Sequence, residues 1–358
     1  MAASFLCTAP GRAGIIGNPT DLYGGSVLSI STAERAAVII EPADELSFEV
    51  AGKRHMVGGP KDLIPDEGLF DVAKAVLSFL DLEEPRFALR WACNVPFRAG
   101  LSSSSAMIVS ILNSVLAFIG RDEHPFRRAE MARHCELHYL GILCGYQDAY
   151  MCTFGGLNYM DFRTKQFYRA FGQEPYATME SLSPYISRYP LVLAHTGVQR
   201  SSGAVHKPIR ERWLEGERDI VRSYLRISHL ARHGKRALLD HDFDLLGELM
   251  VENHEIQRDL GGSGPQNDLL IEAALEAGAL GAKLAGAGNG GTIIALATDK
   301  QELGEALREA GASRIMYPMP SPGYVVKKLK TKRDVEQAEQ ELVGRGKEAD
   351  AEAVIRNT

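Results

Sequence analysis

The stretch Gly100-Leu101-Ser102-Ser103-Ser104-Ser105-Ala106, followed by an apolar run over residues 107–119, decides the fold. The run is long enough for a buried helix, so the small residues stand at a helix start. Consecutive backbone N–H groups at such a start form a cradle for anions, which the helix dipole reinforces. The stretch therefore predicts a phosphate-binding loop. An ordinary serine cap before a core helix is the alternative, and this loop alone does not separate the two.

The serine loop differs from the Walker A loop of P-loop NTPases. No lysine follows a glycine at the required spacing, so that class of nucleotide site is excluded. A hydroxyl group in the loop can still reach a magnesium ion, which prefers oxygen ligands and bridges phosphates. Ser104 is the candidate for this contact.

Strand and helix patterns alternate around the loop. Upstream, β-branched residues predict strands over 27–30 and 36–40, separated by turn-forming or charged residues. Helical apolar spacing predicts a helix over 71–80, and alternation predicts a strand over 86–94. After the loop we expect a helix over 121–143 and a strand over 157–162.

The second half predicts a further α+β layer. The expected helices are 212–233, 242–258 and 266–277, and the expected strands are 190–195, 282–285 and 292–297. Weak patterning before residue 190 places a domain boundary there, giving an N-terminal domain over 1–180 and a C-terminal domain over 181–358. The tail over 333–357 is charged and helix-prone, so we expect a surface helix or a partly frayed end.

Composition narrows the class of partner. The chain has 358 residues, of which 45% are hydrophobic, so it can bury a large core, and we expect two domains. A net charge of -6 gives no basic field for nucleic acid or an anionic membrane. The five cysteines show no CxxC spacing and are expected to be reduced, and the first residues lack a secretion signal. We expect a cytoplasmic monomer or homodimer that acts on a small molecule.

A second glycine-rich loop, Gly286-Ala287-Gly288-Asn289-Gly290-Gly291, formally matches the dinucleotide-binding pattern G-x-G-x-x-G. That pattern must open a helix, whereas the β-branched residues at 292–296 predict a strand. A dehydrogenase is therefore the least favoured function. The loop is expected to join two strands beside a ligand, with a plain flexible turn as the alternative.

A third element, over residues 10–25, places Arg12 and Asp21 among glycines that permit the close approach of a ligand. Asp21 suits the recognition of a polyol, but it could equally cap a neighbouring segment. Between these elements, Glu136 and Asp148 could face one cavity and supply a metal ligand and a catalytic carboxylate. By themselves, two such carboxylates are more often surface charges.

Together, these motifs resemble the GHMP kinase superfamily, named for galactokinase, homoserine kinase, mevalonate kinase and phosphomevalonate kinase. The resemblance rests on APGRAGIIGNPTDLYGG from Ala9, PFRAGLSSSSA from Pro96 and KLAGAGNGG from Lys283, in this order. It implies an α+β fold with a ribosomal protein S5 domain 2-like N-terminal domain and a ferredoxin-like C-terminal domain. It also implies a cleft for ATP, Mg²⁺ and a small-molecule substrate.

The resemblance assigns roles to individual residues. Asp148 would orient or deprotonate the substrate hydroxyl, and Arg12 would stabilise charge on the transferring phosphoryl group. Ser104 and Glu136 would hold Mg²⁺. The residues implied to bind ATP are Pro96, Gly100, Leu101, Ser102, Ser103, Ser104, Ser105 and Ala106. The residues implied to contact the sugar or line the floor of the site are Asn18, Asp21, Tyr23, Gly24, Gly286 and Gly288.

Within the superfamily, the chain is most similar to glucuronokinases. Galactokinases carry Glu-His before the Thr-Asp of the first motif, where this chain has Asn18-Pro19. The segments from Leu140 and from Ser202 also resemble glucuronokinase. This predicts phosphorylation of D-glucuronate at its anomeric hydroxyl, with Arg200, Lys207 and Arg210 as candidate partners of the carboxylate.

Other functions remain open at this point. They are kinases for heptose 7-phosphate, fucose, arabinose, galacturonate or mevalonate, and a non-catalytic ligand sensor on the same fold. The presence of Arg12, Ser104, Glu136 and Asp148 argues against the sensor. Asn289, at a position where relatives commonly have a smaller residue, leaves the backbone donors of its loop intact.

Overall fold

The computed structural model of the protein describes residues 3–166, 169–198 and 202–355. Within these residues, the larger sheet has the strand order β12-β1-β2-β5-β3-β4, and β6 and β7 extend it beside β2. Its strands are β1 (Ser4–Ile16), β2 (Ser26–Pro42), β3 (Ser47–Val50), β4 (Lys53–Met56), β5 (Phe87–Cys93), β6 (Leu157–Asp161), β7 (Thr178–Ser181) and β12 (Val325–Leu329). The expected β-rich start of the chain is confirmed.

The strand β2 corrects one expectation. Residues 27–30 and 36–40 belong to a single strand, whose first part pairs with β6 and whose second part pairs with β5. The charged residues between them lie where the pairing of β1 with β2 shifts register, between Pro10 and Arg12. Glu34 and Arg35 therefore mark an irregularity inside a long strand, because a register shift bends a strand without ending it.

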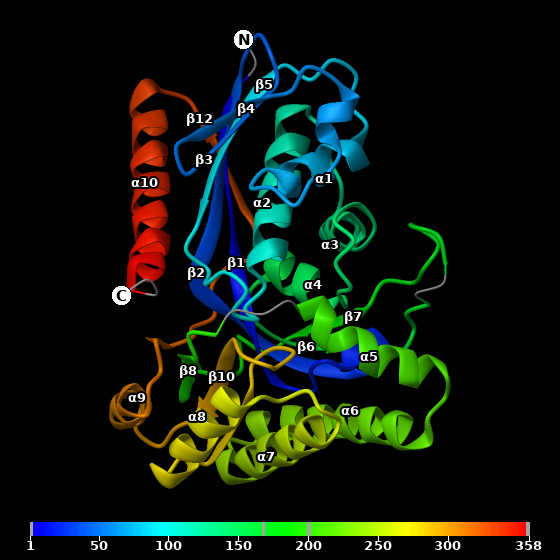
Figure 1. Ribbon diagram of the computed structural model, residues 1–358, viewed down its shortest axis with the longest axis vertical. Coiled ribbons are helices and arrows are strands. Elements are labelled where there is room, and N and C mark those ends of the chain that lie inside the picture. Colours follow the sequence, from blue (N-terminus) through cyan, green and yellow to red (C-terminus); the bar gives the residue numbers. More distant parts are fainter. Residues whose placement is uncertain (1–2, 167–168, 199–201, 356–358) are drawn as a thin grey trace.

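Helices cover both faces of this sheet (Figure 1). One face carries α1 (Asp71–Leu80), α2 (Ser103–Phe118), α3 (Pro125–His134), a π-helical turn (Cys135–Tyr139) and α4 (Gln147–Phe154). Short 3₁₀ helices lie at Thr20–Tyr23 and Pro60–Leu63. The expected helix over 121–143 is thus shorter, because α3 passes into the π-helical turn and ends before Gly141, which has a positive φ.

The smaller sheet has the antiparallel order β11-β8-β10-β9 within the described residues. Its strands are β8 (Leu191–His195), β9 (Gly281–Leu284), β10 (Thr292–Leu296) and β11 (Arg314–Met316). The helices of this half are α5 (Ser202–Leu214), α6 (Arg218–Leu239), α7 (Phe243–Asp259), α8 (Pro265–Glu276) and α9 (Lys300–Glu309). Apolar residues of α8 and α9 pack on the sheet and form a core of their own.

Most elements expected in this half are present, with one boundary wrong. The helix expected over 212–233 is broken between α5 and α6, where Gly216 adopts a positive φ that ends the first helix. The loop 286–291 joins the antiparallel strands β9 and β10, as expected. A strand therefore follows the G-x-G-x-x-G pattern, and the helix that a dinucleotide site requires is absent there.

The end of the described chain returns to the larger sheet. Strand β12 pairs with β1, and α10 (Lys332–Ile355) packs Val335, Ala338 and Leu342 against an apolar cluster on β1, β2 and β12. In Figure 1, α10 lies on the opposite face of the sheet from α1 and α2. The charged tail is thus a helix with one apolar stripe. We propose a division of the chain into two domains near residue 180. Strand β12 then joins the sheet of the first domain, and α10 covers one face of it.

Two further expectations concern the cysteines and membrane-spanning helices. All five cysteines are free thiols, and burial raises the pKa of Cys7 and Cys93 to about 12. In the part of the chain that the structure describes, no helix is both long and apolar enough to span a membrane.

Candidate active site

A cavity of about 280 Å³ opens where β1 passes between the serine loop and the glycine-rich loop. The backbone N–H of Arg12 donates to the carbonyl of Leu101, and that of Gly14 donates to the carbonyl of Ala285, both at 3.0 Å. One strand therefore holds both loops. This explains how motifs far apart in the sequence come to line one cavity.

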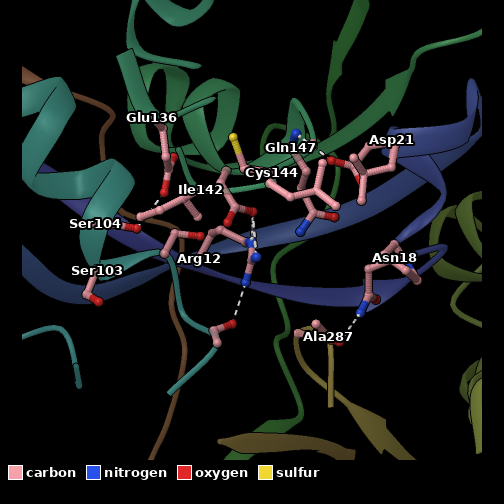
Figure 2. A pocket seen from close by; sticks show the side chains of 18 of the residues that line it. Arg12, Asn18, Asp21, Ser103, Ser104, Glu136, Ile142, Cys144, Gln147 and Ala287 are labelled. Atoms are coloured by element: carbon pink, nitrogen blue, oxygen red, sulfur yellow. Dashed lines mark hydrogen bonds and ion pairs between the residues drawn. The ribbon is translucent and has the colours of Figure 1, made fainter. Parts of the chain in front are cut away.

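Arg12 lies at the centre of the cavity (Figure 2). Its Nε donates to Asp148 Oδ1 at 2.7 Å, and its Nη2 lies 2.5 Å from the same oxygen. Its Nη1 donates to the carbonyl of Gly100 at 2.6 Å. The guanidinium thus fixes Asp148, at the start of α4, against the serine loop at the start of α2, because a planar fork binds two partners in a set geometry.

The serine loop meets Glu136 on one side of the cavity. The hydroxyl groups of Ser104 and Ser105 each donate to one carboxylate oxygen of Glu136 at 2.6 Å. Glu136 is 3% exposed, and desolvation, followed by the charge of Asp148, raises its pKa. In Figure 2, Ser104 and Glu136 lie together, beside Arg12. The sequence thus correctly placed Glu136 and Asp148 in one cavity.

Asp21 reaches the cavity from the opposite side. Its Oδ2 accepts hydrogen bonds from the backbone N–H groups of Tyr146 and Gln147, at 2.8 and 3.0 Å, and so holds the first turn of α4. A Cβ atom at Gly145 would lie 1.8 Å from this oxygen, so only glycine permits the contact. Burial raises the pKa of Asp21 to about 6. Both roles considered for Asp21 are compatible, because it caps a helix and also lines the cavity.

The glycine-rich loop is held by buried side chains that the sequence did not assign to this task. Asn18 Nδ2 donates to the carbonyl of Gly286 at 3.0 Å, and Lys283 Nζ donates to Asn18 Oδ1 at 2.7 Å. Lys283 is fully buried, and desolvation lowers its pKa well below the ordinary value. The amide of Asn18 is thus occupied by protein partners, and Asn18 positions the loop.

Asn267 holds the other end of the loop from α8. Its Oδ1 accepts from the N–H of Gly290 at 2.5 Å, and its Nδ2 donates to the carbonyl of Gly290 at 3.1 Å. A side chain at Gly288 would also clash, because a Cβ atom there would lie 1.7 Å from the carbonyl of Gly262. The loop therefore has a set conformation, which the plain flexible-turn interpretation does not explain.

The structure divides the predicted site residues into two groups. Those that line the cavity are Arg12, Asn18, Asp21, Gly100, Ser102, Ser103, Ser104, Glu136, Asp148 and Gly286. Those that do not are Pro96, Leu101, Ser105, Ala106, Tyr23, Gly24 and Gly288. Tyr23 instead stacks on Tyr224 with ring centroids 4.1 Å apart. Its side chain therefore packs against α6.

Several residues that line the cavity were not predicted from the sequence. They are Pro19, Leu22, Phe97, Arg98, Ile142, Leu143, Cys144, Gly145, Gln147 and Ala287. Gln147 is the most informative, because it is 2% exposed and its Oε1 has no hydrogen-bond partner in the described part of the chain. Figure 2 shows its side chain among those that line the cavity. Its position next to Asp148 in the sequence was the signal that could have drawn attention to it.

Of the cations expected for a uronate carboxylate, the described Arg210 does not line this cavity. Arg200 and the side chain of Lys207 lie outside the described residues, and Arg210 is half-buried near Tyr23. The arginines that line the cavity are Arg12 and Arg98. Arg98 is exposed, lies over the ring of Phe97 at 5.5 Å and has no ion pair with a described residue.

Comparison with known proteins agrees with this geometry. Residues 69–156 match the family described as GHMP kinases N terminal domain, and residues 235–313 match GHMP kinases C terminal. Glucuronokinase 1 of Arabidopsis thaliana is 29% identical over 326 residues, covering 84% of this chain and 88% of the relative. A mevalonate kinase of Methanothermobacter thermautotrophicus is 25% identical over 292 residues, covering 80% and 88%.

The fold is also that of solved kinases. The crystal structure of Lactococcus lactis galactokinase complexed with galactose superposes with a TM-score of 0.73 at 18% identity, covering 90% of this chain and 95% of the other. The chain therefore carries the N-terminal and C-terminal domains of GHMP kinases, and its relatives are phosphotransferases with an alcohol group as acceptor. Among its relatives, glucuronokinases are similar over most of its length.

Proposed function

We propose that the protein transfers the γ-phosphoryl group of ATP to the anomeric hydroxyl of a free sugar acid, D-glucuronate, and forms the 1-phosphate. The observation that carries this proposal is the Arg12–Asp148 pair at the centre of the cavity, between the serine loop and the loop 286–291. The similarity to Arabidopsis glucuronokinases supports the choice of sugar acid.

In the proposed reaction, Asp148 accepts the proton of the anomeric hydroxyl as its oxygen bonds to the γ-phosphorus. The bond between that phosphorus and the β–γ bridging oxygen breaks, and ADP leaves. Arg12 is within contact of Asp148 and of the serine loop, so it can share the negative charge that develops between them. Positioning and charge neutralisation supply most of the catalysis in such transfers.

The residues at the serine loop fit a magnesium ion. Ser104 and Glu136 offer hard oxygen donors 2.6 Å apart, and the desolvated carboxylate of Glu136 gains from a nearby cation. No group of three or more His, Cys, Asp or Glu side chains in the described residues could hold a metal alone. Magnesium usually completes its coordination with phosphate oxygens and water, so it would supply charge neutralisation when bound with the nucleotide.

The sugar would lie between Asp148, Asp21 and Gln147. The Oδ1 atom of Asp21 has no hydrogen bond to a described residue, and neither does the buried Oε1 atom of Gln147. A buried amide without partners is unfavourable by about 1–3 kcal/mol, so a sugar hydroxyl that pairs with it gains affinity. These groups favour a polyol over the sparsely hydroxylated mevalonate.

The test measures ADP formation from Mg-ATP with a panel of acceptors. D-glucuronate should be turned over fastest. Its 1-O-methyl glycoside should be inert, because its anomeric oxygen is blocked, and glucose should be poorer because it lacks the carboxylate. Galacturonate, fucose, arabinose, heptose 7-phosphate and mevalonate complete the panel. Turnover of another acceptor alone would reassign the substrate, and no turnover of any would favour the ligand sensor.

Arg98 provides a sharper test of the carboxylate. If it pairs with the uronate, Arg98→Gln should raise KM for glucuronate by roughly tenfold and leave KM for ATP unchanged. If it pairs with a phosphate of ATP, the variant should raise KM for ATP and leave KM for glucuronate unchanged. The exposed Arg236 on α6 offers a matched control, Arg236→Gln, with neither effect expected.

A further inference from the structure

A second cavity, of about 430 Å³, lies beside α3 and is separate in its lining from the active site. Its wall is formed by α3, the π-helical turn and residues 169–176. We call it the α3 pocket. Its basic lining residues are Arg127, Arg133, His134, His138 and Arg169. None of these residues lines the active-site cavity.

The acidic residues of the α3 pocket are already paired. Glu130 binds the hydroxyl group of Tyr150 and lies 2.8 Å from Lys165 Nζ. Glu174 accepts from the hydroxyl of Tyr146 at 2.9 Å and lies 3.3 Å from the same Lys165. Lys165 and the two tyrosine hydroxyls thus already bind both carboxylates, so neither carboxylate makes a close ion pair with an arginine of the pocket.

Arg133 and Arg169 lack comparable partners. Arg133 is 8% exposed, yet its Nε has no hydrogen-bond partner in the residues described, and its nearest carboxylate contact, to Glu174, is 4.0 Å long. Arg169 has no ion pair within the described chain, whereas Arg127 pairs with Glu123 at 3.0 Å. A buried guanidinium donor without an acceptor is costly, so it indicates a missing acceptor.

Two histidines add neutral or cationic donors. His134 and His138 lie with ring centroids 4.4 Å apart, and His134 also packs on Phe171. Burial, followed by the charges of His138 and Arg133, lowers the pKa of His134 to about 4. Arg127, Arg169, Glu130 and Glu174 are the other charged groups of the pocket. An anion among these groups would offset the repulsion between them.

We propose that the α3 pocket is a second ligand site, which binds a phosphate-bearing anion. Guanidinium groups bind phosphate oxygens bidentately, and imidazoles donate to the remaining oxygens. The volume is larger than inorganic phosphate needs, so a phosphate ester fits as well. A divalent metal is disfavoured, because three arginines face the same space.

The α3 pocket is connected to the active site through one tyrosine. The guanidinium of Arg133 lies 3.8 Å from the ring centroid of Tyr146, whose backbone N–H binds Asp21 in the active-site cavity. An anion that draws Arg133 toward the pocket would therefore act on the first turn of α4, which carries Asp148. This contact gives the second site a physical route to the proposed sugar site.

The experiment follows the histidine resonances by NMR in the full chain. The active site is first filled with Mg²⁺ and a non-hydrolysable ATP analogue, so that added phosphate cannot bind at the serine loop. Inorganic phosphate and glucose 1-phosphate are then titrated separately. We expect saturable shifts of His134 and His138 and a higher pKa of His134. Tighter binding of the ester would indicate a metabolite as ligand, and equal binding would indicate phosphate itself.

Variants separate this site from non-specific binding. The double change Arg127→Gln with Arg169→Gln should weaken phosphate binding by roughly tenfold or more, because charged hydrogen bonds are lost. Arg236→Gln is the matched control and should leave binding unchanged. The proposal is overturned if neither anion shifts these resonances at tens of millimolar, or if the double variant binds as the unmodified protein does. Binding is read without turnover, so this outcome is independent of the proposed kinase reaction.

Discussion

The two walls of the active-site cavity are built in different ways. The charged wall consists of two hydrogen-bonded pairs that line the cavity, Arg12 with Asp148 and Ser104 with Glu136. The glycine floor, residues 286–291, presents mainly backbone, and its shape depends on the buried Asn18, Lys283 and Asn267. Side chains that face the substrate cavity and side chains that hold its shape therefore differ in their contacts: the first bind one another, and the second bind backbone groups of the loop.

The largest expected effect is on the charged wall. Asp148→Asn should lower kcat by about a thousandfold, because the variant cannot accept the proton of the hydroxyl. ATP affinity should be nearly unchanged, since Asp148 bonds to Arg12 and to no residue of the serine loop. Steady-state kinetics with a separate measurement of ATP binding checks both. Unchanged turnover would remove Asp148 from the mechanism, and a loss confined to ATP affinity would reassign it.

The second prediction concerns Asp21, which lines the cavity and holds the first turn of α4. Its pKa of about 6 in the folded state exceeds the ordinary 3.8, so folding takes up a proton between these values. Stability from this group is therefore complete below about pH 4 and is lost as pH rises through 6, a change of roughly 3 kcal/mol.

Asp21→Asn should remove this dependence, because an amide does not titrate in this pH range. The amide oxygen can still accept from the N–H groups of Tyr146 and Gln147, so the first turn of α4 stays in place. Urea unfolding of both proteins from pH 4 to 7 measures it. The difference in unfolding free energy should move in favour of the variant as pH rises. A constant difference across this range would contradict the raised pKa.

The sequence and its family resemblance predicted the residues of the charged wall: Arg12 and Ser104 lie inside glycine-rich motifs, and Glu136 and Asp148 lie in the segment after the serine loop. Glu136 and Asp148 were expected in one cavity, and they lie there. The supports of the glycine floor were not predictable in this way. Asn267 lies on α8 and meets Gly290 only through the tertiary fold, and Asn18 was expected to contact sugar although its amide binds Gly286 and Lys283.

Tyr23 shows that a residue inside a motif can also lie outside the site. It belongs to the first motif, yet its ring packs on Tyr224 of α6. Local pattern also misjudged where elements end: polar residues inside β2 suggested a break, and Gly216 ends α5 inside an expected helix. In each case a long-range contact or a single backbone angle decided the outcome, and neither is visible in residue spacing.

The third prediction acts on the glycine floor. Asn267→Ala removes both hydrogen bonds to Gly290 and leaves buried backbone groups unpaired, so the free energy of unfolding should fall by about 2 kcal/mol. Asn267→Asp keeps the acceptor for the N–H of Gly290 but places a fully buried carboxylate against the carbonyl of that residue, so at neutral pH it should lose more. Chemical denaturation measures both, and an unchanged free energy of unfolding in either variant would show that the hydrogen bonds do not set the stability of the loop.

The smallest expected effect is at Gln147. Gln147→Met keeps the volume but removes the unpaired amide, so KM for the sugar should rise by roughly tenfold while KM for ATP stays the same. Monodeoxy sugars identify the contact, because the analogue that lacks the hydroxyl bound by Gln147 should bind the unmodified protein and the variant equally weakly. If the loss of each hydroxyl raises KM by the same factor in both proteins, Gln147 does not contact the sugar.

The most direct test of the central claim is the phosphorus NMR spectrum of the product formed from Mg-ATP and D-glucuronate. We expect a phosphomonoester whose phosphorus couples to the anomeric proton, formed by the unmodified protein and almost absent with Asp148→Asn. Coupling to the proton of another carbon, or ADP formed with inorganic phosphate as the only other product, would contradict it.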